Sequence, residues 1–513
     1  MVLGIPYFYS NKLFVLSSIK KLATQTVWYG ASTIFSRMLG YLLTPLLTSI
    51  FVASDFGKIT TLFTLAAFMN ILYSFGMETA YFRFLSEEKE NKVYNAAFTT
   101  ILVSGCFFSL LLFGLTDAVA AYIKLSDHTE YIYWVIWIVI FDTLAVLPFA
   151  KLRYSGRPKK YAFIKIINII IQIGLVIFFL IICKNAEKGS WLSSLYDHQT
   201  GVGYVILANV FSSALTLLLL SAELFKYRWS FGKEFFRKMI IYALPLLIVG
   251  FGGMVNELID RFMILQLYPG TVVEKYTQSG IYSANFKLAI VIVLFIQAFR
   301  LGAEPFFFKQ SIQVNAPIIY ARVMKYFVIT CCICFLMVVL FLDFWKYFMG
   351  NRHTEYWNGL HVVPILMLAK IFLGIYYNLS VWYKLTNKNL TGAWITLGGV
   401  VITVAINFLM IPSWGYTACA VATLCCYGFM MVASYLLGQK HYPVPYDIKI
   451  IGTYILVAVL IFGLHFYLSQ FVTSLIVRFV TGALFSLSYL IVVFNIDRKE
   501  FIQLPVIRKW FAH

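Results

Sequence analysis

The stretch GMETAYFRF at residues 76–84 places a glutamate, Glu78, inside a long apolar segment and follows it with a basic residue. The stretch GAEPFFFK at 302–309 repeats this arrangement around Glu304. An ionisable side chain in an apolar segment of this length is costly if the segment lies in a membrane, so it marks either a functional site or a structural pair. Its recurrence in the two halves of the chain indicates an internal repeat.

The composition is typical of a membrane protein built from helices. Of the 513 residues, 61% are hydrophobic and only 12% are charged, with a mean hydropathy of +0.81. So few charges cannot cover a soluble surface, and apolar runs of about 20 residues recur along the chain. These runs are continuously apolar and do not alternate, which favours helices over a β-barrel.

We therefore predict an all-α polytopic membrane fold with fourteen transmembrane helices. The predicted spans are 27–52, 57–85, 93–116, 131–154, 161–183, 203–222, 240–267, 281–309, 320–342, 357–384, 390–411, 416–438, 448–467 and 472–494.

The positive charge of the chain indicates how these helices are oriented. The two tails and the even-numbered connections hold roughly two thirds of the 41 lysines and arginines, as the positive-inside rule requires of cytoplasmic segments. The densest of them is the connection from Lys151 to Lys165. Both termini are therefore predicted to be cytoplasmic. This distribution explains most of the net charge of +19, so no nucleic-acid partner is expected.

Two glycines extend the repeat. Gly57 in DFGKI and Gly280 in QSGIY each stand at the start of the long span that ends on a motif glutamate. Six spans separate the copies, so both halves have the same orientation and are related by an axis along the membrane normal. This plan predicts two six-helix lobes with a cleft between them, suited to alternating access. The predicted segments are a cytoplasmic or interfacial N-terminal segment (1–26), a first lobe (27–225), a linker (226–239), a second lobe (240–438), two additional helices (448–494) and a cytoplasmic tail (495–513).

The same stretches resemble a known family. SRMLGYLLTPLLTSIFVASDFGKITTLFTL (36–65) and SGIYSANFKLA (279–289), each with its glutamate motif, are similar to the Wzx-type polysaccharide and O-antigen flippases. That family lies in the superfamily of the MATE exporters and lipid II flippases. The resemblance implies a bacterial inner-membrane flippase that moves an undecaprenyl-diphosphate-linked oligosaccharide to the outer leaflet, for O-antigen or capsule. The expected partners are this glycan, membrane lipids, a polysaccharide polymerase and glycosyltransferases, and the protein is expected to be a monomer.

Basic residues inside the predicted spans are candidates for binding the substrate's diphosphate. Arg37 and Lys370 lie near the midplane, about 15 Å deep at 1.5 Å per residue. Guanidinium and ammonium groups bind phosphate oxygens, so these cations suit an anionic headgroup. The alternative is that they form structural ion pairs between helices. The predicted substrate-binding cations are Arg37, Arg261, Lys287, Arg300 and Lys370.

Other residues in the spans are assigned to the cavity wall or to a gate. The candidate polar and acidic cavity residues are Asn70, Asp142, Glu257 and Asp260, of which Glu257 or Asp260 could instead neutralise Arg261. The motif charges lie only about 10 Å or less from the cytoplasmic end of their spans, too shallow for a midplane site. They are predicted to be inner-gate or helix-fixing residues: Glu78, Arg83, Glu304 and Lys309.

The sequence carries no catalytic or metal-binding motif. The largest outward connection, 184–202, is short, and the histidines and cysteines lack metal-ligand spacing. We therefore expect no enzyme activity, no cofactor and no metal. A cation-coupled exporter of the MATE type stays an alternative, because Asp142 could carry the coupling, although the first span holds Arg37 instead of an acid. A membrane enzyme acting on lipid-linked sugars and a non-transporting scaffold are further alternatives.

Overall fold

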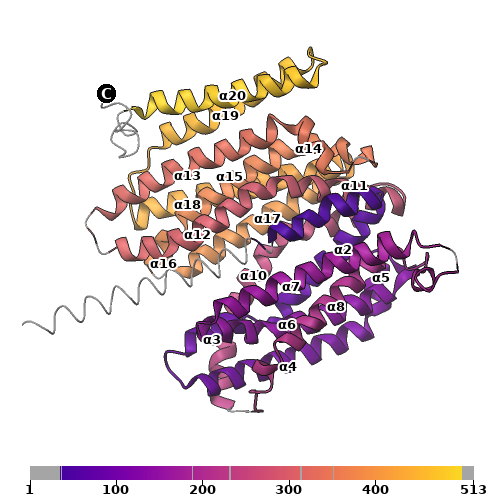
Figure 1. The fold of residues 1–513 in the computed structure, drawn as a ribbon. Coiled ribbons are helices and arrows are strands. Elements are labelled where there is room, and N and C mark those ends of the chain that lie inside the picture. Colours follow the sequence, from indigo (N-terminus) through magenta and orange to yellow (C-terminus); the bar gives the residue numbers. More distant parts are fainter. Residues whose placement is uncertain are drawn as a thin grey trace, which may run out of the picture. The chain divides into compact units, whose positions relative to one another are not determined.

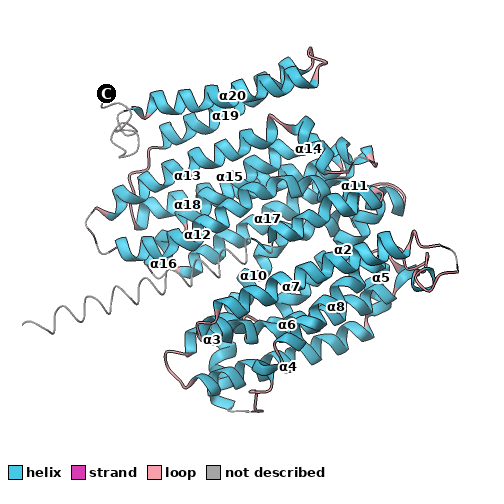
Figure 2. Cartoon of the chain, in the orientation of Figure 1, coloured by secondary structure: helices cyan, strands magenta, loops and turns pink. Residues whose placement is uncertain are grey.

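The structure is a computed structural model that describes residues 35, 37–187, 189–229, 233–311, 313, 315–350, 352–386 and 388–498. Over these residues the chain consists of helices joined by turns, without a strand (Figure 2). Twelve of the described helices are long and apolar enough to cross a membrane, and α8 (Gly203–Leu219) is a shorter apolar helix. The all-α membrane fold is confirmed. The count of fourteen spans stays a prediction, because the predicted first span, 27–52, lies partly outside the described residues.

Contacts within the chain define two compact units, Met1–Gly280 and Ile281–His513. The elements of both are labelled in Figure 1. The boundaries of the two predicted lobes rest on the sequence repeat and not on these contacts, so they stay a prediction.

The first unit begins with helical residues 37–50 and continues through ten helices and three short turns of other helix types. Its α-helices after residue 50 are α2 (Ala53–Ser74), α3 (Met77–Phe84), α4 (Glu90–Gly114), α5 (Thr116–Tyr122), α6 (Glu130–Tyr154), α7 (Pro158–Ile177), α8, α9 (Ser221–Leu224), α10 (Lys233–Leu267) and most of α11 (Val272–Phe286). The other turns are η1 (Ser126–His128), the π-helical η2 (Phe178–Cys183) and η3 (Ser193–Leu195).

The core of the first unit includes α10 as well as the earlier helices. Met77 and Tyr81 of α3 pack with Tyr94 of α4 and with Met239 and Ala243 of α10, and all five are fully buried. Because lipid tails are as apolar as these side chains, close packing and hydrogen bonds hold such helices together more than apolar burial does. α10 is therefore an integral part of this bundle.

The two spans that carry the glutamate motifs are broken, which the sequence reading of 57–85 and 281–309 as continuous helices did not foresee. In the first, Phe75 and Gly76 adopt left-handed conformations and separate α2 from α3. A Cβ at Gly76 would only touch the Ala243 carbonyl, at 3.4 Å, so it is the positive φ that favours glycine here. In the second, helix begins earlier, at Val272, and a 3₁₀ turn, η4 (Lys287–Ala289), divides α11 from α12 (Ile290–Gln310).

The second unit continues from the end of α11 with eight further α-helices after α12. They are α13 (Ala316–Val339), α14 (Leu342–Phe348), α15 (Val363–Leu379), α16 (Val381–Leu385), α17 (Asn389–Trp414), α18 (Tyr416–His441), α19 (Ile448–Ser469) and α20 (Leu475–Ile496), with the 3₁₀ segment η5 (Thr354–Val362) before α15. The α17–α18 hairpin turns at Gly415, whose positive φ favours glycine. α18 packs against both α17 and α15.

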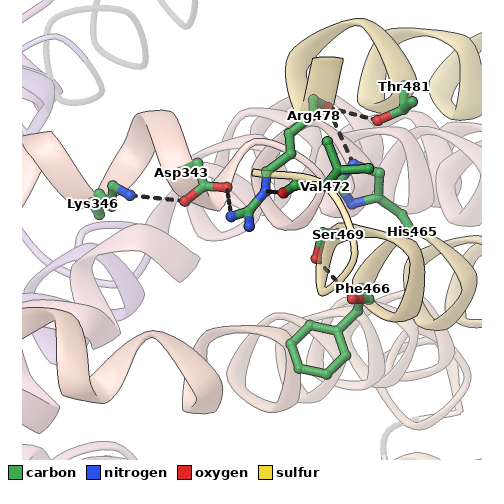
Figure 3. A network of polar contacts seen from close by, with 8 residues as sticks. All are labelled: Asp343, Lys346, His465, Phe466, Ser469, Val472, Arg478 and Thr481. Atoms are coloured by element: carbon green, nitrogen blue, oxygen red, sulfur yellow. Dashed lines mark hydrogen bonds and ion pairs between the residues drawn. The ribbon is translucent and has the colours of Figure 1, made fainter. Parts of the chain in front are cut away.

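The hairpin α19–α20 is fixed to α13 near both ends of that helix. Near its start, Lys325 Nζ lies 2.9 Å from Asp497 Oδ1, and Tyr454 donates to Asp497 Oδ2 at 2.6 Å. Just beyond its end, Asp343 accepts from Lys346 and from Arg478, at 2.9 and 3.0 Å (Figure 3). Most of the hairpin's remaining surface is exposed apolar side chains, so these polar contacts fix its register on the bundle.

We expect Lys325→Met to destabilise the protein strongly, because it leaves the buried Asp497 carboxylate without its cation. Removing one partner of a buried ion pair costs about 3–5 kcal/mol. The midpoint of thermal unfolding in detergent measures the effect. Lys92→Met, in an exposed pair with Glu88, is the control and should cost less than about 1 kcal/mol. Equal midpoints for the two variants would contradict a structural role for the Lys325 pair.

The second anchor should depend on pH. Burial raises the pKa of the Asp343 carboxyl, but hydrogen bonds and charges from Lys346 and Arg478 outweigh burial and hold its pKa below the usual range. A carboxyl of this kind stabilises the fold above its ordinary pKa of about 4 and loses the contribution as the pH falls through its lowered value. We expect the stability difference between the wild type and Asp343→Asn to shrink on acidification below about pH 4. A difference that stays constant as the pH is lowered well below about 4 would contradict the assignment.

Candidate functional site

The first unit encloses a polar cavity of about 340 Å³. Five helices contribute to its wall: α2, α3, α6, α7 and α8. The side chains that line it are Asn70, Glu78, Asp142, Ala145, Val146, Phe149, Arg153, Tyr161, Lys165, Asn168, Asn209, Ser213 and Thr216. Four of these are ionisable acids and bases of opposite sign, an unusual concentration of charge inside a bundle of apolar helices.

An ion pair lies at one side of this cavity. Arg153, in the last turn of α6, donates to Glu78 Oε1 in the first turn of α3. The break at Phe75 and Gly76 starts a new helix at Met77, so Glu78 falls in the first turn, where the helix dipole favours an acid. The Arg153 guanidinium also stands 4.9 Å from the ring centre of Phe82. Glu78 therefore pairs with a base, as predicted for a gate or helix-fixing residue, although that role itself stays a prediction.

Asp142 lies within the cavity wall, in a set of polar side chains. Ser213 Oγ donates to Asp142 Oδ1 at 2.7 Å and is 3.3 Å from Asn209 Oδ1. Asn70 lines the same cavity and accepts from Thr143 at 3.3 Å. The structure thus brings together two residues predicted for a cavity, Asn70 and Asp142, and joins α2, α6 and α8 through them.

Several residues of this cavity were missed by sequence reasoning. Arg153 and Lys165 were counted only as part of the basic cytoplasmic connection, yet both line the cavity, and Lys165 Nζ lies 4.3 Å from the Phe149 ring centre. The missing signal is a helical period: polar residues recur every three or four positions on two otherwise apolar helices. They are Tyr161, Lys165 and Asn168 on α7, and Asn209, Ser213 and Thr216 on α8.

Other bases of the same connection have acidic partners in the first unit. Glu223 is almost fully buried and lies 2.9 Å from Lys160 and 3.8 Å from Arg157. Lys151 is 3.8 Å from Glu90. These pairs therefore join α6 to α4 and α7 to α9, in addition to the predicted role of the connection in orientation.

A second group of predicted residues lies on α10. Arg261 donates to Asp260 Oδ1 at 2.6 Å and to the Glu257 carbonyl at 2.7 Å, and Arg261 and Asp260 are each only 4% exposed. The neutralisation of Arg261 considered from the sequence is thus observed, with Asp260 as its partner. Arg37 is exposed, and Tyr41 on the same helix is within electrostatic reach of both Arg37 and Glu257.

The second unit holds the remaining predicted cations. Lys370 on α15 is fully buried, and its Nζ lies 4.6 Å from the ring centre of Phe286 and 5.1 Å from that of Tyr427. Arg300 on α12 stacks on Tyr377 at 4.1 Å. Lys287 begins the 3₁₀ turn η4 and is half-buried. Aromatic rings attract a cation through their negative faces, so these rings stabilise charge where lipid cannot.

Of the other predicted gate residues, the structure describes the side chain of Arg83 only. Arg83 is half-exposed and pairs with Glu87 at 2.7 Å, one turn along the chain, so it lies apart from the Glu78–Arg153 pair. The side chains of Glu304 and Lys309 lie outside the described residues, and their assignment stays a prediction.

The fold and these sites define a multi-pass helical membrane protein. A family model described as "Polysaccharide biosynthesis protein" matches residues 22–309, more than half of the chain. The chain belongs to this family, which confirms the resemblance noted from its motifs.

Solved structures agree on the fold. The lipid II flippase MurJ in an inward closed conformation is 14% identical, with a TM-score of 0.68 over 91% of this chain and 99% of that one. The MATE multidrug transporter DinF-BH is 16% identical, with a TM-score of 0.57 over 83% and 96% of the two chains. The Vibrio cholerae MATE transporter VcmN in its bent form is 9% identical, with a TM-score of 0.53 over 82% and 96%. Among the curated proteins, none matches the chain.

We expect substitutions of Glu78 and Arg153 to have coupled effects on the equilibrium between the inward-facing and outward-facing states. Arg153→Met leaves a carboxylate beside the cavity without its cation, and Glu78→Gln leaves the guanidinium, so each single variant should shift the inward/outward balance. The double variant should lie closer to wild type, with a coupling of about 0.5–3 kcal/mol. Accessibility of cytoplasmic-side cysteines to a soluble reagent measures the balance. Additive single effects would contradict coupling.

Proposed function

We propose that this protein is a flippase that moves an undecaprenyl-diphosphate-linked oligosaccharide from the cytoplasmic to the outer leaflet of a bacterial inner membrane. Transport proceeds by alternating access and serves the biosynthesis of a cell-surface polysaccharide such as O-antigen or capsule. The observation that carries the proposal is the match to the polysaccharide biosynthesis family, joined to basic side chains held within membrane helices.

The chemistry of the substrate agrees with the residues of the spans. A lipid diphosphate carries negative charge into a medium that does not solvate it, so its passage requires cations already held at depth. We assign this role to Arg37, Arg261, Lys287, Arg300 and Lys370. The attached glycan is neutral or weakly charged and rich in hydroxyls, so it needs hydrogen-bonding walls. Asn70, Asp142, Glu257 and Asp260 are proposed for these walls.

The cavity of the first unit supports the second part of this assignment. Its wall combines amides, hydroxyls, two carboxylates and two bases with the rings of Phe149 and Tyr161. Such a mixture of polar groups and aromatic faces suits sugars, which present hydroxyls and apolar C–H faces together. The proposed partners are the lipid-linked glycan, membrane lipids, a polysaccharide polymerase and glycosyltransferases, with the flippase acting as a monomer.

One observation favours a second candidate function, a cation-coupled exporter of small molecules. Asp142 is a carboxylate inside a polar cavity, where an ion or proton could be exchanged. Its neighbour Lys165 and the Glu78–Arg153 pair make that cavity nearly balanced in charge, which weakens the case for a bound cation. Extrusion of a cationic dye from cells, abolished in Asp142→Asn, would favour the exporter over the flippase.

The flippase is tested by complementing a strain that lacks its own flippase and following the lipid-linked glycan across the leaflets. We expect Arg37→Gln and Lys370→Met to lower transport about tenfold or more, because each removes a charge-assisted contact to phosphate worth about 1.5–3 kcal/mol. Methionine keeps most of the lysine's volume, so Lys370→Met preserves packing around Phe286 and Tyr427.

Lys92→Met is the matched control, since it removes an exposed lysine charge and should leave transport unchanged. Full surface glycan in both cavity variants at normal abundance would contradict the proposed role of these cations. Absence of any glycan movement by the wild-type protein would contradict the flippase itself.

A further inference from the structure

The two glycines that define the sequence repeat touch each other. A Cβ added to Gly57 on α2 would collide with the Tyr276 carbonyl on α11, and a Cβ added to Gly280 would collide with the Ala53 carbonyl. The contact is reciprocal, because Ala53 and Tyr276 each lie four residues before the glycine of their own helix. All four residues are buried. Helices in membranes approach this closely only where small residues replace side chains at the crossing.

The crossing lies at the end of the first unit that holds the connections after residues 50, 114 and 267. Tyr276 donates a hydrogen bond from its hydroxyl to the carbonyl of Ile123, in the turn between α5 and η1. Gln266 Nε2 similarly donates to the Tyr122 carbonyl. The distribution of lysine and arginine assigns this end to the outer face of the membrane. One helix of each predicted repeat therefore meets the other at the predicted outer side.

The crossing is held by close backbone packing. It also buries hydroxyls that have no partner in the described structure. Thr61, one turn after Gly57 on α2, and Ser279, next to Gly280 on α11, are both fully buried with unpaired side-chain oxygens. A buried unpaired hydroxyl is unfavourable, and water would satisfy it if the helices separated. Tight backbone packing favours the closed crossing, whereas these hydroxyls oppose it.

We propose that the Gly57–Gly280 crossing is the outer closure of the transport path, and that α2 and α11 separate there in each cycle. This inference rests on the proposed transport function and on the predicted orientation. Gly57 and Gly280 set how tightly the crossing closes, Tyr276 latches it to the turn at Ile123, and Thr61 and Ser279 limit its stability.

The test measures how readily a water-soluble reagent reaches the crossing in the absence of substrate. Ser279→Cys, a nearly isosteric change, is placed in a protein whose two exposed cysteines, Cys106 and Cys425, are replaced by serine. A membrane-impermeant maleimide is added from the outer side. We expect Gly57→Ala to raise the labelling rate about tenfold, the effect of about 1.4 kcal/mol on a two-state balance. The added methyl group meets backbone, which cannot move aside as a side chain can.

A change of opposite sign sharpens the test. Thr61→Val keeps the shape of threonine and removes the unpaired hydroxyl, so it should favour the closed crossing and lower the labelling rate severalfold. The matched controls are Gly174→Ala on α7 and Gly253→Ala on α10, where an added Cβ meets open space. These controls make the same chemical change in a helix and should leave labelling unchanged.

Equal labelling of Gly57→Ala and the two glycine controls would overturn the proposal, as would labelling of Ser279→Cys from the cytoplasmic side only. If the Gly57→Ala protein fails to insert into the membrane, Tyr276→Phe provides the test instead. This change removes the hydrogen bond to the Ile123 carbonyl without adding volume, so it should also raise the labelling rate. If labelling shifts as expected but the protein moves no lipid-linked glycan, the proposed closure is supported and the flippase function is rejected. Unshifted labelling in a protein that does move glycan rejects only the closure.

Discussion

The structure depends on one constraint: a backbone N–H or C=O in lipid has no water to bond, so it must be satisfied within its own helix. The described chain departs from regular helix at several positions inside its spans, and two of the breaks lie where the backbone is packed or buried. The break at Phe75 and Gly76 packs against Ala243 of α10. The 3₁₀ turn at Lys287 lies among residues that are largely buried. Each departure redirects a helix that carries ionisable groups, so backbone irregularity and charge occur together.

The same constraint decides how charge is held at depth. An ionisable group in lipid must be paired, must line a polar space or must face aromatic rings. The first unit uses the first two solutions, with the Arg261–Asp260 pair and with the cavity around Asp142. The second unit uses the buried Lys325–Asp497 pair and the rings around Lys370 and Arg300. Both units thus combine a buried ion pair with other surroundings for charge inside their helices.

The sequence predicts the all-α fold well because membrane helices are selected by length and apolarity, which are local properties. It also predicts that Asn70 and Asp142 face a cavity. It does not predict that Arg153 and Lys165 line the same cavity. The positive-inside rule already explains basic residues at helix ends, so their place in the cavity wall gives no separate signal in the sequence. The helix breaks were missed for a related reason: apolarity continues across Phe75 and across Leu288, while the turn depends on backbone conformation and tertiary contact.

The repeat motif carries two kinds of information that the structure separates. Its glycines keep their symmetry, since each of Gly57 and Gly280 faces the residue four positions before the other. Its glutamates lose theirs locally, because Glu78 begins a separate short helix whereas Glu304 lies well inside α12. The glycines of the motif meet at one close helix crossing, which needs a small residue from both helices. The two glutamates have different helical surroundings, so a role read from Glu78 does not carry over to Glu304 by position in the motif alone.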